Sequence, residues 1–245
     1  MKRFKADLHI HTCLSPCADL DMSPRAIVEK SLERGIDLIA VCDHNSAENV
    51  GAALRAGAQR GLPVFAGMEI NSKEEVHILA IFENEEQALL MQEIVYRHLN
   101  GTNRPDLFGD QVVANEFDEV EGFNDRMLIG ATQLELREIV REVHKLGGLT
   151  IASHVDRPSF SILSQLGFIP HGLELDALEI SRNLKGKCIQ SVIPDAGKFP
   201  IVTFSDAHFL DDIGRTHTSF FVESPGLNEV RLALAGQSGR RVGID

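Results

Sequence analysis

The sequence contains no tryptophan and only one tyrosine, so aromatic residues make up just 6% of its 245 positions. Aliphatic side chains must therefore build most of the buried core. Hydrophobic residues account for 43% and charged residues for 24%, a globular balance that argues against a disordered or fibrous chain. A single α/β barrel can have this length, and we expect one domain over residues 1–245.

Basic residues are scarce: 24 lysines and arginines face 36 acidic residues, a net charge of −12. Because binding along a phosphate backbone needs a basic face, we expect no long nucleic acid as a partner. The four cysteines are too few for a disulfide scaffold. No apolar run reaches the ~18 residues of a membrane span, and the charged first residues do not resemble a signal peptide. We therefore expect a cytoplasmic protein without membrane association.

Short apolar runs alternate with segments of helical periodicity, which predicts an α/β fold with parallel strands in an open or closed sheet. Strands are expected at residues 4–10, 37–42, 63–68, 76–82, 149–153, 177–180, 201–204 and 219–222. Helix-start signals are Ser23-Pro24, Asn84 with Gln87, and Thr132 with Glu135. Residues 100–131 break this rhythm, being acidic and rich in glycine, and predict an inserted loop or hairpin.

Histidines and carboxylates gather at the ends of the expected strands. Asp7, His9 and His11 end the first one, and residues two apart on a strand face the same side. Further candidates at strand ends are Asp43, His44, Glu69, His154, Asp206 and His208. His77 is the exception, because it opens a strand. The carboxyl ends of strands form the functional face of α/β folds, so this joint pattern favours a metal cluster over scattered surface histidines.

The ligand types indicate which metals such a cluster would bind. Imidazole and carboxylate without thiolate suit Zn, Mn or Fe. There are more candidates than one metal can use, which predicts two or three divalent metal ions with bridging carboxylates. Thiolate ligation remains conceivable, although Cys42 is best explained as small buried filler. Cys13 and Cys17 lie near the expected metal loop and would be prone to oxidation if exposed.

The ordered motifs, from Asp7-Leu8-His9-Ile10-His11-Thr12 to Ser205-Asp206-Ala207-His208, resemble the polymerase and histidinol phosphatase (PHP) family. The resemblance extends from Asp7 to about Gly214 and is closest to the stand-alone, metal-dependent phosphoesterases. It implies a distorted (β/α)7 barrel with up to three metals at the carboxyl ends of the strands.

The resemblance also implies a role for each ligand position. The first metal would be held by His9, His11, Glu69 and Asp206. The second would be held by Glu69, as a bridge, with His77 and His154. The third would be held by His44, His208 and a residue of the loop after the first motif. The family pattern has His-Thr-x-x-Ser-Asp-Gly there, whereas this chain continues Ser15-Pro16-Cys17-Ala18-Asp19. Treating Pro16-Cys17-Ala18 as an insertion makes Asp19 the expected ligand, with Asp21 as the alternative.

Three further residues are weaker candidates. Asp43 could orient His44 from behind the ligands, or simply cap the next helix. Arg157 and Arg182 each follow an expected strand, and arginine binds phosphate with two parallel hydrogen bonds. Surface ion pairs explain either arginine equally well.

These residues and the resemblance together predict a metal-dependent phosphoesterase. We expect a metal-bound hydroxide to attack phosphorus in a small phosphorylated metabolite or a nucleotide. Hydrolysis of an amide or ester is one alternative, because paired metals also serve aminopeptidases. The other is a non-catalytic module stabilised by metal, against which the complete set of ligand-type residues argues.

Overall fold

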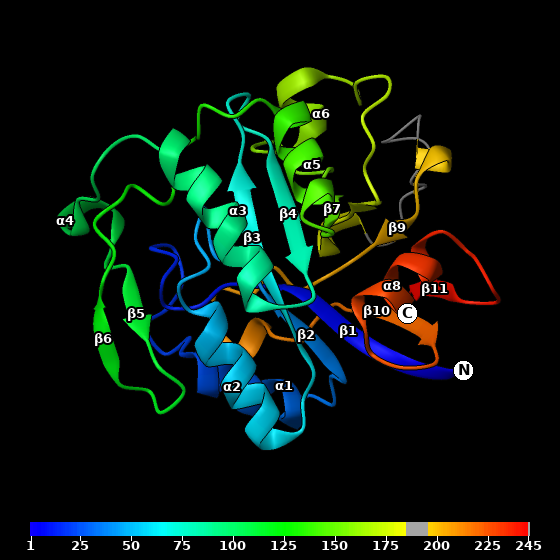
Figure 1. Cartoon of the computed structure of the whole chain (residues 1–245), viewed down its shortest axis with the longest axis horizontal. Coiled ribbons are helices and arrows are strands. Elements are labelled where there is room, and N and C mark those ends of the chain that lie inside the picture. Colours follow the sequence, from blue (N-terminus) through cyan, green and yellow to red (C-terminus); the bar gives the residue numbers. More distant parts are fainter. Residues whose placement is uncertain (185–195, 245) are drawn as a thin grey trace.

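A nine-stranded mixed sheet organises the chain, for which the computed structural model describes residues 1–184 and 196–244 (Figure 1). Its strands lie in the order β11-β10-β1-β2-β3-β4-β7-β8-β9. Their bounds are β1 Lys2–Ile10, β2 Leu38–Val41, β3 Val64–Asn71, β4 His77–Phe82, β7 Leu149–Ala152, β8 Ala177–Glu179, β9 Ile201–Val202, β10 Thr218–Val222 and β11 Arg241–Ile244. The eight predicted strands all have counterparts here, with ends shifted by a few residues, and β11 was not predicted.

The segment after β9 returns to β1 and nearly closes the sheet into a barrel. The His11 amide donates to the Ala207 carbonyl over 3.0 Å, and the Ser205 amide donates to Asp7 Oδ1 over 2.9 Å. The circuit β1-β2-β3-β4-β7-β8-β9 therefore contains seven strands, while β10 pairs with residues 2–6 of β1 and carries β11. The expected distorted (β/α)7 barrel is confirmed.

Strand β4 runs antiparallel to both of its neighbours, β3 and β7, which corrects the expectation of parallel strands here. A tight turn at residues 72–76 reverses the chain, with the Ser72 amide donating to the Val76 carbonyl over 2.9 Å. The amino end of an antiparallel strand lies at the same edge as the carboxyl ends of parallel strands. His77 therefore reaches the functional edge although it opens its strand.

Helices cover the outside of the sheet, with α1 beside α2 and α3 lying across β3 and β4 (Figure 1). Their bounds are α1 Pro24–Glu33, α2 Val50–Arg60, α3 Glu85–His98, α4 Pro105–Phe108, α5 Leu136–Lys145, α6 Ile162–Leu166 and α8 Leu227–Leu234. The Ser23 hydroxyl accepts the Ala26 amide, which confirms the predicted cap of α1.

Two other helix starts differ from the predicted capping boxes. Asn84 caps α3 by accepting the Gln87 amide, but the Gln87 side chain donates to the Leu146 carbonyl instead of closing the box. Helix α5 begins three residues later than predicted, because Glu135 is its N-cap. The Thr132 hydroxyl donates to the Asn71 carbonyl, so it anchors the preceding turn to β3.

The inserted stretch forms a separate two-stranded antiparallel sheet, β5 (Val112–Ala114) and β6 (Val120–Phe123), at the left of Figure 1. The Val112 amide donates to the Cys13 carbonyl over 2.9 Å. At Gly109, where φ is +98°, an added Cβ would lie 2.7 Å from the Pro16 carbonyl oxygen. Glycine is therefore required where this stretch packs against the loop that follows β1.

Mostly aliphatic side chains fill the barrel, among them Leu8, Leu38, Leu79 and Ile151, with Phe204 as one of the few aromatic members. This core agrees with the scarcity of aromatic residues. Among the described residues, no helix is both long and apolar enough to cross a bilayer.

Candidate metal centre

The strand ends bring eight of the nine predicted ligands together at one edge of the barrel. β1 supplies one histidine and the segment directly after it another, the loop after β2 supplies one, and β3 and β4 supply one residue each. The loops after β7 and β9 supply the rest. These residues are His9, His11, His44, Glu69, His77, His154, Asp206 and His208. All but Asp206 and His208 are buried, and the Asp206 side chain is itself only 7% exposed.

The Glu69 carboxylate lies at the centre of this group. Five imidazoles approach its two oxygens, with nitrogen–oxygen distances between 3.1 and 3.5 Å. They belong to His9, His11, His44, His77 and His154. Glu69 Oε1 and His77 Nδ1 lie 3.1 Å apart but are not oriented for a hydrogen bond, and the buried His154 Nδ1 has no hydrogen-bond partner either. Buried polar atoms normally have a partner, so these atoms fit a site that takes a cation.

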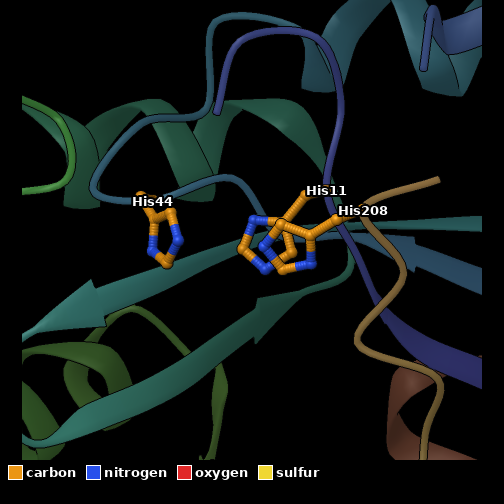
Figure 2. A group of neighbouring side chains, drawn as sticks. All are labelled: His11, His44 and His208. Carbon is orange, nitrogen blue, oxygen red and sulfur yellow. The ribbon is translucent and has the colours of Figure 1, made fainter. Parts of the chain in front are cut away.

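Three overlapping sets of side chains have the spacing of metal ligands. Their ligand atoms lie within 4.8 Å of one another in each set. The sets are His9, His11 and Asp206; His44, Glu69 and His77; and His11, His44 and His208. Figure 2 shows the last set, in which the His11 and His208 rings stack with centroids 4.2 Å apart. Shared members make the cluster suitable for more than one ion.

Electrostatics distinguish the two histidines that end β1. Burial lowers the pKa of His11 to about 4, and His208 acts in the same direction. Burial opposes protonation of His9 as well, but neighbouring carboxylates, Glu179 foremost, raise the pKa of His9 well above its usual value. Although Glu69 is buried, His77 and His9 hold the pKa of that carboxyl well below its usual range. His11 and Glu69 are therefore in the neutral and ionised forms that bind divalent metals, whereas His9 must release a proton when a metal binds.

Backbone strain is concentrated at the same edge. Four non-glycine residues of this region have positive φ angles: Asn45 at 51°, His154 at 30°, Phe160 at 54° and Asp206 at 49°. Such conformations cost about 1–3 kcal/mol each and persist where the surroundings enforce them. Two of the four, His154 and Asp206, are predicted ligands. Holding their backbone in this conformation therefore lowers the stability of the fold.

Glu179 is a site residue that sequence reasoning missed. It ends β8, is 1% exposed, and its Oε2 lies 3.0 Å from His9 Nδ1. The same oxygen accepts the His154 amide over 3.1 Å. Its place at a strand end was the available signal, since the candidate ligands occupy equivalent places.

Asp43 lies behind the ligands rather than among them. Its carboxylate accepts the Thr12 amide and hydroxyl and the Ser15 hydroxyl, over 2.6–2.7 Å. Ser15 Oγ lies 3.0 Å from His11 Nδ1 and accepts the His44 amide over 3.2 Å. Asp43 therefore ties the loop after β1, which follows His11, to the loop after β2, which carries His44.

The two arginines differ in position. Arg157 forms an ion pair with Asp206 and lies on the wall of a cavity of about 220 Å³ beside the ligands. Arg182 lies on a smaller neighbouring cavity of about 100 Å³, with its side chain 54% exposed and 3.7 Å from Asp212. Only Arg157 borders the larger cavity.

Asp19 and Asp21 do not join the cluster. Both residues are exposed, and Asp19 Oδ1 accepts the Asp21 amide over 2.9 Å. Neither lies on the cavity wall. Cys17, two residues before Asp19, does lie on that wall, together with His44, Glu69 and His208. Cys13 and Cys42 are buried, and Cys188 lies outside the described residues.

The structure thus defines a nearly closed α/β barrel with a candidate metal centre of buried imidazoles and carboxylates at its strand ends. A family model described as the PHP domain matches residues 7–159, more than half of the chain. The chain therefore belongs to the PHP family.

Individual relatives cover most or half of the chain. The uncharacterized protein YqxK of Bacillus subtilis (strain 168) is 24% identical over 99% of this chain and 64% of its own length. A 5'-3' exoribonuclease of Haemophilus influenzae is 26% identical over 49% of this chain and 46% of its own. The lesion-specific endonuclease PfuEndoQ from Pyrococcus furiosus superposes with a TM-score of 0.76 at 21% identity, covering 98% of this chain and 58% of its own. The chain thus spans less than two thirds of each.

These relatives correct the expectation that long nucleic acids are not partners. Two of them are named as nucleases, so the net charge of this chain is not sufficient ground to exclude a nucleic acid partner. The physical reason is that net charge describes solubility and long-range attraction, whereas bound divalent cations reverse the charge inside the site.

Proposed function

We propose that the chain is a metal-dependent phosphodiesterase that cleaves a phosphoester bond of a nucleotide unit in a nucleic acid strand or a short piece of one. The convergence of five imidazoles on Glu69, beside a cavity that also holds Arg157, carries this proposal. A cavity of about 220 Å³ suits a phosphate group with part of its sugar, and leaves the rest of a strand outside.

The proposed ligand sets follow from the family pattern and fit the observed groups. His9, His11, Glu69 and Asp206 would hold the first metal, and Glu69 with His77 and His154 the second. His44 and His208 would hold a third. When bound, these ions supply Lewis acidity that activates water and neutralises charge on the phosphoryl oxygens.

Arg157 would bind a non-bridging phosphate oxygen. Its guanidinium already lies beside Asp206, which holds it over the cavity and limits its rotamer freedom. A guanidinium carries several N–H donors. Some of them can stay bonded to the Asp206 carboxylate while others donate to the phosphate of the substrate.

Exposed aromatic side chains favour a nucleotide over a metabolite without a base. Phe160 is 40% exposed, lies on the cavity wall and stacks on His77 with centroids 4.8 Å apart. Phe209, directly after His208, is 53% exposed. Bases stack on such rings with about 1–3 kcal/mol each, independently of sequence.

Activity on a substrate panel tests the proposed function. Protein reconstituted separately with Zn, Mn or Fe(II) should cleave short single-stranded DNA or RNA faster than p-nitrophenyl phosphate, and chelation should abolish both reactions. The panel should include duplex DNA with and without a lesion, a nucleoside 3′,5′-bisphosphate and an amide substrate. Amide cleavage without phosphoester cleavage by the metal-loaded protein would overturn the proposal.

Replacing Arg157 tests its contact with phosphate. Charge-assisted hydrogen bonds contribute about 1.5–3 kcal/mol, so Arg157→Ala should raise KM by about 10- to 100-fold. Arg157→Lys should recover part of this loss, because lysine keeps the positive charge but lacks the paired, coplanar N–H donors of the guanidinium. Arg141→Ala is the matched control, since Arg141 is 58% exposed and pairs with Glu142 at the surface. An unchanged KM in Arg157→Ala would remove Arg157 from the substrate site.

A cytoplasmic location belongs to the same proposal. Cys13, Cys17 and Cys42 are free cysteines. Reducing compartments keep thiols in this state, which supports the assignment.

A further inference from the structure

The inserted stretch, residues 100–131, carries a large share of the exposed apolar side chains. In the described part of the chain, thirteen large hydrophobic side chains are exposed, and five of them lie between residues 107 and 123. These five are Leu107, Phe108, Phe117, Val120 and Phe123. Soluble proteins seldom gather exposed apolar side chains in one short segment unless that segment contacts a partner.

Val120 and Phe123 lie on one face of the hairpin formed by β5 and β6. Phe123 is opposite Val112 in the strand register, and Val120 is opposite Ala114. Opposite residues of an antiparallel pair project to the same face, and Val112 and Ala114 share a face because they are two residues apart. The β5 half of this face is buried against Cys13, whereas Val120 and Phe123 on the β6 half are 59% and 60% exposed. The apolar face is therefore only half covered.

The backbone at the outer edge of β6 is available for a further strand. Among the described residues β6 pairs with β5 alone, and it lies on the side of β5 away from the barrel (Figure 1). The Val112 amide donates to the Cys13 carbonyl and the Val112 carbonyl accepts from Asn49, so both groups point away from β6. Opposite residues of an antiparallel pair either bond to each other or both point outwards. The amide and carbonyl of Phe123 therefore point to the open edge, while the next amide, of Asn124, bonds across the hairpin.

The charge of the inserted stretch decides which kind of chain this edge can accept. Residues 100–131 contain seven carboxylates and two arginines, a net charge of −5. Glu119, Glu121 and Asp125 are exposed beside the edge, and none of them forms an ion pair with a described residue. A second copy of the chain would bring the same charges, and a nucleic acid strand would bring phosphates, so both are repelled. A segment rich in lysine or arginine is attracted.

We propose that the open edge of β6 binds an extended, basic segment of a partner protein, which adds a third strand to the hairpin. The main chain of the partner bonds to the Phe123 backbone, and its apolar side chains at alternate positions cover Val120 and Phe123. Its lysines or arginines pair with Glu121 and Asp125. This inference goes beyond the proposed function and depends neither on the metals nor on the substrate.

Anisotropy titration of the full chain with labelled peptides tests this surface. The probe is a fluorescein-labelled decapeptide that alternates lysine with valine, and a decapeptide that alternates glutamate with valine is the charge control. The native chain should bind the lysine–valine peptide at least about 10-fold more tightly than the glutamate–valine peptide. The same lysine–valine peptide, N-methylated at every second residue, should lose most of its affinity, because it can no longer donate to a strand edge.

Three variants separate the contributions of apolar surface and charge. Phe123→Ser should weaken binding of the lysine–valine peptide by about 10- to 100-fold, because it removes the largest apolar contact at the edge. Glu121→Gln combined with Asp125→Asn should weaken binding less and reduce its salt dependence. Leu90→Ser is the matched control, since Leu90 is a 44% exposed residue of α3 away from the hairpin, and it should bind as the native chain does. Thermal unfolding of all three should match that of the native protein, because the replaced side chains are exposed.

Several results would overturn the inference. Equal binding of the two charge-opposed peptides, full affinity for the N-methylated peptide, or native affinity in Phe123→Ser would each exclude an added basic strand. A native dimer that Phe123→Ser dissociates in sedimentation would make a second copy the occupant. Weaker binding of single-stranded DNA by Phe123→Ser than by the native chain would make it a nucleic acid.

Discussion

Glu69→Gln should reduce phosphoester hydrolysis by on the order of 100-fold or more, above the range typical of residues that only support metal ligands. The substitution keeps the size of the side chain but replaces one oxygen with an amide donor and removes the charge. Five imidazole nitrogens lie within 3.1–3.5 Å of this carboxylate. As the proposed bridge between two metals, Glu69 affects both at once, so the metal content per chain should fall together with turnover.

The control variants for this experiment differ in burial. Glu93→Gln changes a carboxylate of α3 that is 64% exposed and pairs with Arg97, so it should be silent. Arg182→Ala removes a side chain that is 54% exposed on the neighbouring cavity, and its effect should be smaller than that of Glu69→Gln. A Glu69→Gln protein that keeps its metals, and loses less activity than Arg182→Ala, would contradict the bridging role.

The metal cluster was predicted from the two-residue periodicity of strands and from the positions where strands end. Both features can be recognised in the sequence. His9 and His11 face together because residues alternate along β1, and their Nε2 atoms lie 3.2 Å apart. His77 could be included only as an exception, since apolar runs do not encode strand direction. The reversal at residues 72–76, which makes β4 antiparallel, supplied the missing reason.

Features that depend on long-range contacts or on loop shape were not predictable in the same way. Glu179 contacts His9 across 170 positions of sequence, and its strand ends without a histidine to mark it. The loop at residues 12–19 has no periodicity, so alignment alone selected Asp19. The turn that places Cys17 on the cavity wall depends on bonds to Asp43 and His208. The expectation that long nucleic acids are not partners failed for a related reason. The net charge sums over the whole chain and does not describe the local charge at the site.

The second large effect is expected at Glu179, through the histidine it orients. Its carboxylate accepts a hydrogen bond from His9 Nδ1, which leaves Nε2 as the free nitrogen facing Glu69 and Asp206, each 3.3 Å away. The same oxygen holds the amide of His154, a residue with φ of 30°. Carboxylates behind metal-binding histidines fix the ring tautomer and increase ligand basicity.

Glu179→Ala should therefore lower metal affinity by about 10- to 100-fold, the range reported for such supporting groups. Activity at limiting metal should fall by a similar factor, whereas saturating metal should restore most of it, because Glu179 does not touch the substrate cavity lined by Cys17 and Phe160. Glu179→Gln should be intermediate, since its amide oxygen can still accept from His9 but carries no charge.

Glu174→Gln, an exposed change in the loop before β8, is the matched control. Metal titration followed by activity distinguishes this positioning role from simple unfolding, which excess metal would not reverse. Native-like metal affinity in Glu179→Ala would show that His9 needs no such support.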